Sequence, residues 1–106
     1  MIYIILLNIL VKYIMQLIEI YTAKNCFYCK AAKRLLSIRE TNFVEYDVTN
    51  DVKLRDEMQS RSSGARTVPQ IFINKVHIGG CDELYNLDEL GDLDKILSKT
   101  DGNIKQ

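Results

Sequence analysis

The chain has 106 residues, which is enough for one domain with a single modest core and too few for two. Its 14 basic and 14 acidic residues cancel, so attraction through bulk charge is excluded and no nucleic-acid partner is expected. Three cysteines are too few, and odd in number, for the disulfide framework of a small secreted protein, so we expect a reducing, cytoplasmic location.

Residues 2–18 form a mostly apolar stretch, which is interrupted every four residues by Asn8, Lys12 and Gln16. The stretch is shorter than the about 20 apolar residues of a spanning helix, and it lacks the charge pattern and cleavage site of a secretory signal. Stable membrane insertion is therefore not expected. As a helix with one polar line, it could pack on the domain or lie in a membrane surface. We favour a domain over residues 15–106 that starts at Met15, with residues 1–14 as an apolar extension upstream of the true start.

A first βα unit is predicted from about residue 17 to residue 39, with Asn25 as a plausible N-cap of its helix. Cys26 and Cys29 stand at the start of this helix, where unpaired N–H groups and the helix dipole favour a thiolate. The dipole alone would lower a cysteine pKa by about one unit, so N–H hydrogen bonds and nearby lysines are also needed. This placement predicts thiol–disulfide chemistry, with the more exposed Cys26 as nucleophile and Cys29, one turn further in, as the resolving thiol.

The middle of the chain predicts a second strand and a second helix. Apolar and polar residues alternate over positions 44–48, as they do in a half-buried strand. Asn50 or Asp51 can cap the helix that follows, and residues 62–64 end it. A strand, a helix and a strand in this order predict a right-handed crossover between two parallel strands.

The last third predicts a hairpin and one final helix. Residues 71–73 and 76–78 form short apolar strands that are joined by a tight turn at Asn74. Residues 81–97 carry leucines at helical spacing and predict one helix. Pro69 stands at the start of the third strand, where a proline is tolerated, and composition alone favours a trans peptide before it. The whole order is β-α-β-α-β-β-α, an α/β fold.

Three separated motifs in residues 17–97 resemble a known family. They are Cys26-Phe27-Tyr28-Cys29, then Gly-Ala-Arg-Thr-Val-Pro-Gln-Ile-Phe-Ile at residues 64–73, then His-Ile-Gly-Gly-Cys-Asp-Glu-Leu at residues 77–84. In this order they resemble a dithiol glutaredoxin of the bacterial and mitochondrial type. The resemblance implies a thioredoxin-like fold with a four-stranded mixed sheet flanked by helices. It also implies an enzyme that reduces glutathione mixed disulfides and protein disulfides, with glutathione as co-substrate and no required metal. We expect a monomer.

The resemblance further implies a glutathione site made of nine residues: Lys24, Tyr28, Arg66, Thr67, Val68, Pro69, Gly80, Cys81 and Asp82. The backbone around the proline, with its peptide in the cis form, would pair with the cysteine moiety of glutathione. The start of the last helix would hold the γ-glutamyl group, with Asp82 taking the ammonium, and Asp82 could also cap that helix. The tyrosine would flank the bound thiol, and the two basic residues would attract the glycyl carboxylate.

Two positions depart from the family pattern. Phe27 stands where the family usually has proline, which frees the backbone at the helix start and alters the redox poise. Ala23 stands three residues before the first cysteine, where the family usually has lysine. Lys24 comes one residue later, so its contact with glutathione is the weakest of the nine.

Two other classes of site stay open from the sequence. Cys26, Cys29, His77 and Cys81 have spacings that a zinc site could use, although His77 is expected on the opposite face of its strand. Some glutaredoxins bridge a [2Fe–2S] cluster between two protomers with their first cysteine and glutathione, and the missing proline removes a feature that opposes this. Cys81 could take part in a regulatory disulfide, but a packing role is the simpler expectation.

Overall fold

The computed structural model describes Tyr3, Leu6 and residues 16–97. The elements in residues 16–97 are, in chain order, β1 (Ile18–Thr22), α2 (Phe27–Ile38), β2 (Val44–Asp47), α3 (Val52–Arg61), β3 (Gln70–Ile73), β4 (Val76–Gly79), α4 (Cys81–Glu89) and α5 (Asp92–Leu97). The predicted order is confirmed up to the last helix. The predicted extension, residues 1–14, lies outside the described residues apart from Tyr3 and Leu6. No helix within the described part is long and apolar enough to cross a membrane.

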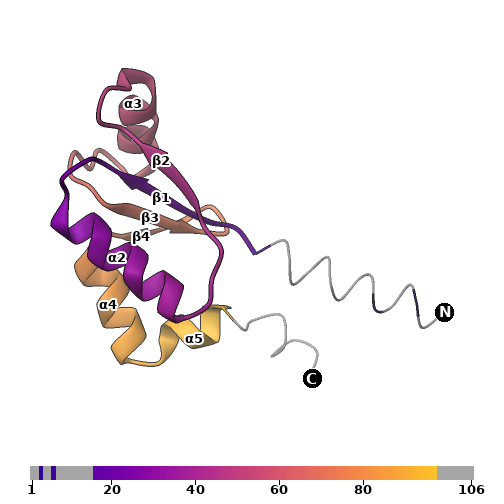
Figure 1. The fold of residues 1–106 in the computed structure, drawn as a ribbon. Coiled ribbons are helices and arrows are strands. Elements are labelled where there is room, and N and C mark those ends of the chain that lie inside the picture. Colours follow the sequence, from indigo (N-terminus) through magenta and orange to yellow (C-terminus); the bar gives the residue numbers. More distant parts are fainter. Residues whose placement is uncertain (1–2, 4–5, 7–15, 98–106) are drawn as a thin grey trace.

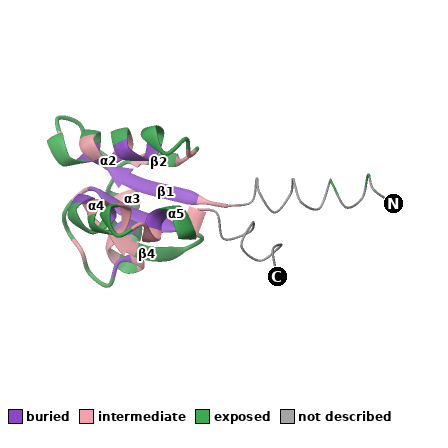
Figure 2. Ribbon diagram, turned by 90° about the horizontal axis from the view of Figure 1, so that it is seen from below, coloured by how far each residue is buried: buried purple, intermediate pink, exposed green. Residues whose placement is uncertain are grey.

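The four strands form one mixed sheet in the order β2-β1-β3-β4. The strand β1 is parallel to β2, as the sequence predicts, and antiparallel to β3, while β3 and β4 form the predicted hairpin. Figure 1 shows α2 and α4 on one face of this sheet and α3 beyond the other. Because helices cover both faces, the central strand β1 is buried along its whole length (Figure 2).

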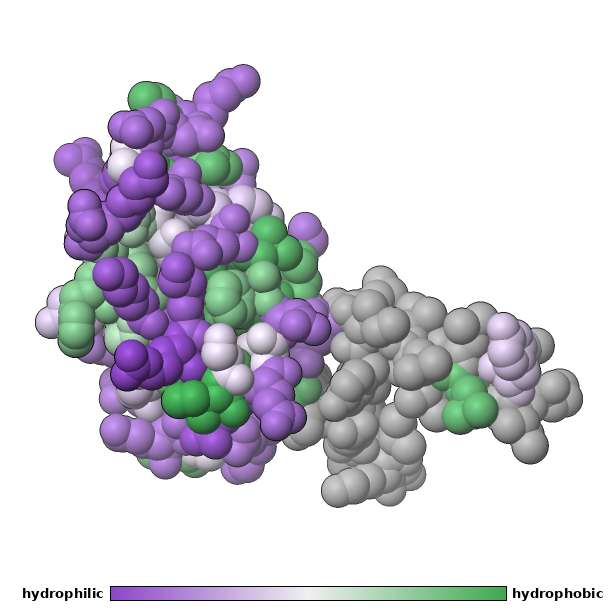
Figure 3. Space-filling model, in the orientation of Figure 1, coloured by the Kyte–Doolittle hydropathy of each residue, from purple (hydrophilic) through white to green (hydrophobic). Residues whose placement is uncertain are grey.

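The two faces of the sheet carry separate apolar cores. Ile20 of β1 packs with Leu36 of α2 and Leu84 of α4 on one face. Tyr21 of β1 and Met58 of α3 pack on the other, because successive strand residues point to opposite faces. Met58 is the one buried residue of α3, and the surface over this helix is mostly hydrophilic in Figure 3. The smaller core therefore depends on few apolar contacts from its helix.

The caps of α2 and α3 test two predictions. The prediction that Asn25 caps α2 is wrong: Asn25 has a left-handed backbone, with φ of 57°, whereas an N-cap residue is extended. Cys26 takes the cap position instead, with φ of −108°. The prediction for α3 is confirmed for Asp51, whose carboxylate accepts a 3.0 Å hydrogen bond from the N–H of Leu54.

The single final helix of the prediction is wrong, because the structure divides it into α4 and α5. Gly91 lies between them with φ of 79°, a left-handed backbone that glycine adopts without cost and that ends helices. Its N–H donates a 3.0 Å hydrogen bond to the carbonyl of Asp88. Leu90 continues the helical spacing of leucines, but its side chain is 72% exposed. The leucine spacing therefore predicts that these residues are helical, but it does not predict where α4 ends and α5 begins.

Candidate active site

Cys26 and Cys29 form a disulfide at the N-terminus of α2, with their Cα atoms 5.2 Å apart. Cys29 is 1% exposed, whereas Cys26 is partly exposed, so the predicted difference in access is confirmed. The N–H of Cys29 donates to the Sγ of Cys26 over 3.1 Å. An N–H group aimed at the outer sulfur, together with the positive end of the helix dipole, stabilises negative charge there. The arrangement gives an accessible sulfur that can carry charge and a buried partner one turn away.

A groove of about 390 Å³ opens beside this pair, and it is lined by Tyr28, Thr67, Val68, Pro69, Gly80, Cys81, Asp82 and Glu83. It contains seven of the nine residues of the predicted glutathione site. The Sγ of Cys26 lies 3.9 Å from the carbonyl oxygen of Val68, so the groove begins at the reactive sulfur. Three segments far apart in the sequence meet here, which is the usual construction of a small-molecule site.

The loop before β3 forms one wall of the groove. The peptide between Val68 and Pro69 is cis, as the resemblance implies, so the trans form that composition alone favours is wrong here. Gly80 faces this loop from the start of α4, where a Cβ atom would lie only 3.3 Å from the carbonyl oxygen of Pro69. A larger residue at position 80 would therefore press the helix start away from the proline loop.

The N-terminus of α4 forms the opposite wall. The prediction that Asp82 caps this helix is wrong, because the N-cap is Gly80, which has no side chain to offer. The N–H of Gly80 donates to Glu83 Oε1 over 2.6 Å, and the N–H groups of the next residues point out of the helix end. The carboxylate of Asp82 is exposed, with no hydrogen-bond or salt-bridge partner among the described residues. The helix end is thus open to an anion, with a carboxylate next to it.

Glu83 lines the groove but is missing from the sequence prediction. A glutamate three residues after the N-cap supplies one half of a capping box by accepting from the N-cap N–H, and this spacing can identify Glu83 from the sequence. Its side chain also fills the space beside Gly79, where an added Cβ atom would lie 2.7 Å from Glu83 Cγ. Glu83 therefore shapes the end of α4 that faces the groove.

Cys81 is buried at 9% exposure and packs in the core under α2 and α4. Burial, and then the charges of Asp82 and Glu83, raise the pKa of its thiol above the ordinary value. A thiol with a raised pKa is a weaker nucleophile at neutral pH because less of it is ionised. These observations favour the packing role for Cys81.

Lys24 and Arg66 lie outside the lining of the groove. Lys24 is exposed and borders a different hollow together with Asp47 and Thr49. Arg66 is exposed and directly precedes Thr67 in the chain. The structure therefore places both charges on the surface without bringing them into the groove.

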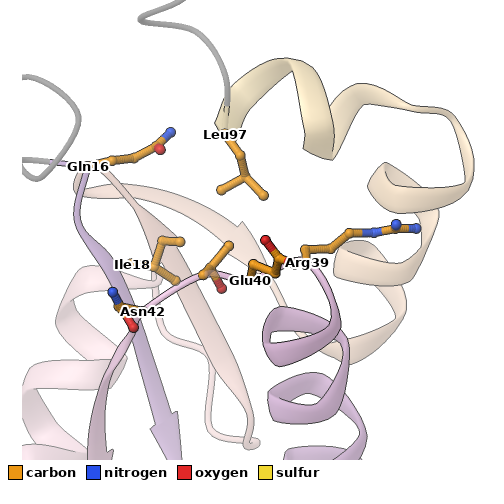
Figure 4. A pocket seen from close by; sticks show the side chains of 7 residues that line it. Gln16, Ile18, Arg39, Glu40, Asn42 and Leu97 are labelled. Carbon is orange, nitrogen blue, oxygen red and sulfur yellow. The ribbon is translucent and has the colours of Figure 1, made fainter. Parts of the chain in front are cut away.

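Another cavity, of about 250 Å³, lies at the C-terminal end of α2 (Figure 4). Its lining residues include Ile18, Glu40 and Leu97, and none of them is a cysteine or a histidine. Arg39 borders this cavity but forms a bidentate ion pair with Asp88, at 2.6 and 2.9 Å. Redox chemistry therefore belongs to the groove at the other end of α2.

The four residues of the alternative zinc site do not come together. Within residues 16–97, Tyr3 and Leu6, no three His, Cys, Asp or Glu side chains are grouped so that they could hold a metal ion. Nε2 of His77 instead lies 2.7 Å from Oε1 of Gln70, and its ring lies tilted against Phe72, which packs on the α3 face of the sheet. The expectation that His77 points to the opposite face is confirmed.

Comparison with known proteins agrees with this geometry. A family model described as glutaredoxin matches residues 18–78. Glutaredoxin 3 from Escherichia coli strain K12 is 51% identical over 80 residues, which cover 76% of this chain and 95% of that protein. The solution structure of a glutaredoxin from Brucella melitensis matches with a TM-score of 0.67 and 49% identity, over 76% of this chain and 87% of that one.

A dithiolic glutaredoxin, 2-C-Grx1 from Trypanosoma brucei brucei, matches with a TM-score of 0.70 and 33% identity, over 82% of this chain and 92% of that one. The residues that the family model matches include the cysteine pair and the loop from Thr67 to Pro69. The chain therefore belongs to the glutaredoxin family, as an oxidoreductase with a thioredoxin-like fold.

Proposed function

We propose that this glutaredoxin uses glutathione as co-substrate to reduce glutathione mixed disulfides and protein disulfides. The observation that carries the proposal is the position of Cys26, whose sulfur lies at the mouth of a groove that ends at an open helix N-terminus. The Cys26 sulfur, the backbone at Val68 and the N–H groups at the start of α4 all border one groove, and they complement the thiol, the backbone and the γ-glutamyl carboxylate of glutathione.

Three parts of the groove would each bind a different part of glutathione. Backbone N–H groups at the start of α4 donate hydrogen bonds to the γ-glutamyl carboxylate, and the exposed carboxylate of Asp82 accepts hydrogen bonds from the ammonium. The backbone of Val68 pairs with the cysteine moiety, as an added strand would. The ring of Tyr28, which is 59% exposed, covers the bound thiol.

The two basic residues outside the groove would act on glutathione mainly through their charge. Arg66 adjoins the Thr67 end of the groove, so we assign it to the glycyl carboxylate. Lys24, which borders another hollow, contributes positive potential near Cys26 without a direct contact.

Reduction of a glutathione mixed disulfide needs Cys26 alone. Its thiolate attacks the glutathione sulfur, a new disulfide forms between Cys26 and glutathione, and the substrate leaves as a thiolate that takes a proton from water. The thiolate of a second glutathione then attacks the glutathione sulfur on Cys26. Oxidised glutathione leaves, and the Cys26 thiolate is restored.

Reduction of a protein disulfide also needs Cys29. Cys26 first forms a mixed disulfide with the substrate, and Cys29 then attacks the sulfur of Cys26 and releases the substrate as a dithiol. The pair is left as the disulfide that the structure contains. Two molecules of glutathione reduce it and leave as oxidised glutathione.

The direct test is the turnover of a mixed disulfide of glutathione and mercaptoethanol, coupled to NADPH consumption by glutathione reductase. We expect turnover that depends on glutathione. The proposal fails if there is no turnover while thioredoxin reductase reduces the protein directly, because this would indicate a thioredoxin-like donor.

Asp82→Asn is expected to raise the KM for this substrate about tenfold, because the carboxylate loses its charge-assisted hydrogen bond to the ammonium. The rate at which iodoacetamide alkylates Cys26 should not change, since that reagent has no ammonium group. Glu89→Gln, an exposed acid at the other end of α4, is the matched control and should leave KM unaltered. An equal rise in both variants would show that the effect comes from helix charge and not from binding.

We further propose that the domain spans residues 15–106 and acts as a cytoplasmic monomer. The family match from residue 18 to residue 78 supports the domain, and a dithiol that must be re-reduced by glutathione supports the compartment. A [2Fe–2S] cluster shared between two protomers stays a prediction, which visible absorbance after anaerobic purification would test.

A further inference from the structure

Gln70 connects the proline loop of the groove to His77 on the neighbouring strand. Its side chain is buried at 5% exposure and does not line the groove. The amide nitrogen of Gln70 donates to the carbonyl oxygen of Thr67 over 3.0 Å. The amide oxygen lies 2.7 Å from Nε2 of His77. Both ends of the buried Gln70 amide thus have a hydrogen-bond partner, and one partner, Thr67, lines the groove.

The hydrogen bond to Thr67 also orients the next N–H group. The carbonyl of Thr67 and the N–H of Val68 belong to one peptide, which is trans, since the only cis peptide among the described residues precedes Pro69. In a trans peptide the two groups point in opposite directions. Because Gln70 holds the carbonyl oxygen on one side, the N–H of Val68 must point to the other.

The side opposite Gln70 is the side of the groove. Gln70 and Phe72 are two residues apart in β3 and so share a face of the sheet, the face that Phe72 fills together with Met58 of α3. The groove is bounded by the start of α4, on the other face. The N–H of Val68 therefore points into the groove.

His77 completes the hydrogen bonding of the Gln70 amide at the end that faces away from Thr67. Only the amide nitrogen can donate to the Thr67 carbonyl, so the amide oxygen must face His77, and His77 must carry its proton on Nε2. With the proton on Nδ1 instead, two acceptors would face each other. The ring of His77 is exposed and lies against Phe72, with 5.0 Å between the ring centroids.

We propose that Gln70 and His77 are positioning residues that aim the N–H of Val68 at the cysteine moiety of bound glutathione. This inference rests on the proposed function of the groove and adds two residues that do not touch the substrate. It assigns His77 a role through Gln70 in place of the zinc ligation that its spacing permits.

The kinetic test replaces each member of the pair. Gln70→Glu keeps the shape but removes the donor, and Gln70→Leu removes both ends. Each is expected to raise the KM for the mixed disulfide of glutathione and mercaptoethanol about tenfold with kcat within about twofold, because binding is lost equally in the ground and transition states. Alkylation of Cys26 by iodoacetamide should not change, because the sulfur and its helix are untouched.

His77 offers a matched pair of variants. His77→Phe keeps the ring against Phe72 without a donor and should raise KM, whereas His77→Gln restores a donor and should recover most of the loss. Ser62→Ala, which removes another buried hydrogen bond on the α3 side, is the control for general destabilisation and should leave KM unchanged. If all variants at positions 70 and 77 keep KM within about twofold of wild type, the inference is overturned and the proposed function still stands.

The ¹⁵N NMR spectrum of His77 tests the arrangement without any substrate. We expect the neutral ring to carry its proton on Nε2, and a ring protonated on Nδ1 would overturn the inference. If the wild-type enzyme shows no turnover of the mixed disulfide, the proposed function fails. The spectrum still decides whether His77 donates to Gln70 and Gln70 to the carbonyl of Thr67.

Discussion

Cys26→Ser is expected to abolish both activities, whereas Cys29→Ser is expected to abolish only the reduction of protein disulfides. A serine hydroxyl at position 26 is not ionised near neutral pH, so attack on a disulfide should slow by at least about a thousandfold. In Cys29→Ser the outer sulfur keeps its place at the helix N-terminus, and the N–H of residue 29 still points at it. Turnover of the mixed disulfide should therefore persist, because glutathione itself releases the product.

The two substrates separate the roles of the two sulfurs. The mixed disulfide of glutathione and mercaptoethanol measures the step that needs one thiol, and a protein disulfide measures the step that needs two. Mass spectrometry of Cys29→Ser should show glutathione bound to Cys26 during turnover. Ser37→Ala, an exposed change on the same helix, is the control and should keep both activities. Equal losses in the two cysteine variants would contradict the division of labour.

The walls of the groove were accessible to sequence analysis because each wall is a continuous segment. The loop that ends at Pro69 and the turn that begins at Gly80 each carry several site residues in a row, so one motif identifies a whole wall. A motif does not predict where the side chain of a residue just outside it will point. Lys24 is two residues from Cys26, yet it borders a different hollow, since the backbone turns at Asn25.

The link between Gln70 and His77 shows a second limit. The strands β3 and β4 do not pair in simple register, because the pairing shifts between Ile71, opposite Gly79, and Phe72, opposite His77. A regular hairpin drawn from the turn gives the pairing of Phe72 with His77 but would set Ile71 opposite Ile78. The sequence can therefore place Gln70 and His77 on one face, whereas the distance between their side chains is visible only in the folded chain.

Arg61→Met is expected to lower the free energy of unfolding by about 3 to 5 kcal/mol at neutral pH, because it leaves a buried carboxylate without its partner. Arg61 reaches from the end of α3 to Glu19 in β1 and forms two hydrogen bonds with it, at 2.8 and 3.1 Å. The side chain of Glu19 is only 7% exposed. The guanidinium also lies 4.1 Å from the ring centroid of Phe72, so methionine replaces its packing but not its charge.

Chemical unfolding monitored by circular dichroism measures this loss. Lys53→Met removes an exposed charge from the same helix and should change the free energy of unfolding by less than about 0.5 kcal/mol. The double variant Glu19→Gln/Arg61→Met should recover much of the stability, because no unpaired charge stays buried. A double variant as unstable as Arg61→Met would indicate that lost packing, and not the unpaired buried charge, causes the effect.

The dependence on pH separates charge from packing. The hydrogen bond from Arg61 holds the pKa of Glu19 below its ordinary value of about 4.5, although burial alone would raise it. In the wild type the ion pair therefore stabilises the fold when the pH is above the ordinary pKa of glutamate. This stability is lost as the pH falls through the lowered pKa of Glu19. Without Arg61, burial is the largest remaining influence and raises the pKa of Glu19 against the hydrogen bond from Tyr46, so protonation removes the unpaired charge of the variant as the pH falls. The difference between wild type and Arg61→Met should thus be smaller at pH 4 than at pH 7, and an equal difference at both would mean that Arg61 acts through its packing on Phe72 alone.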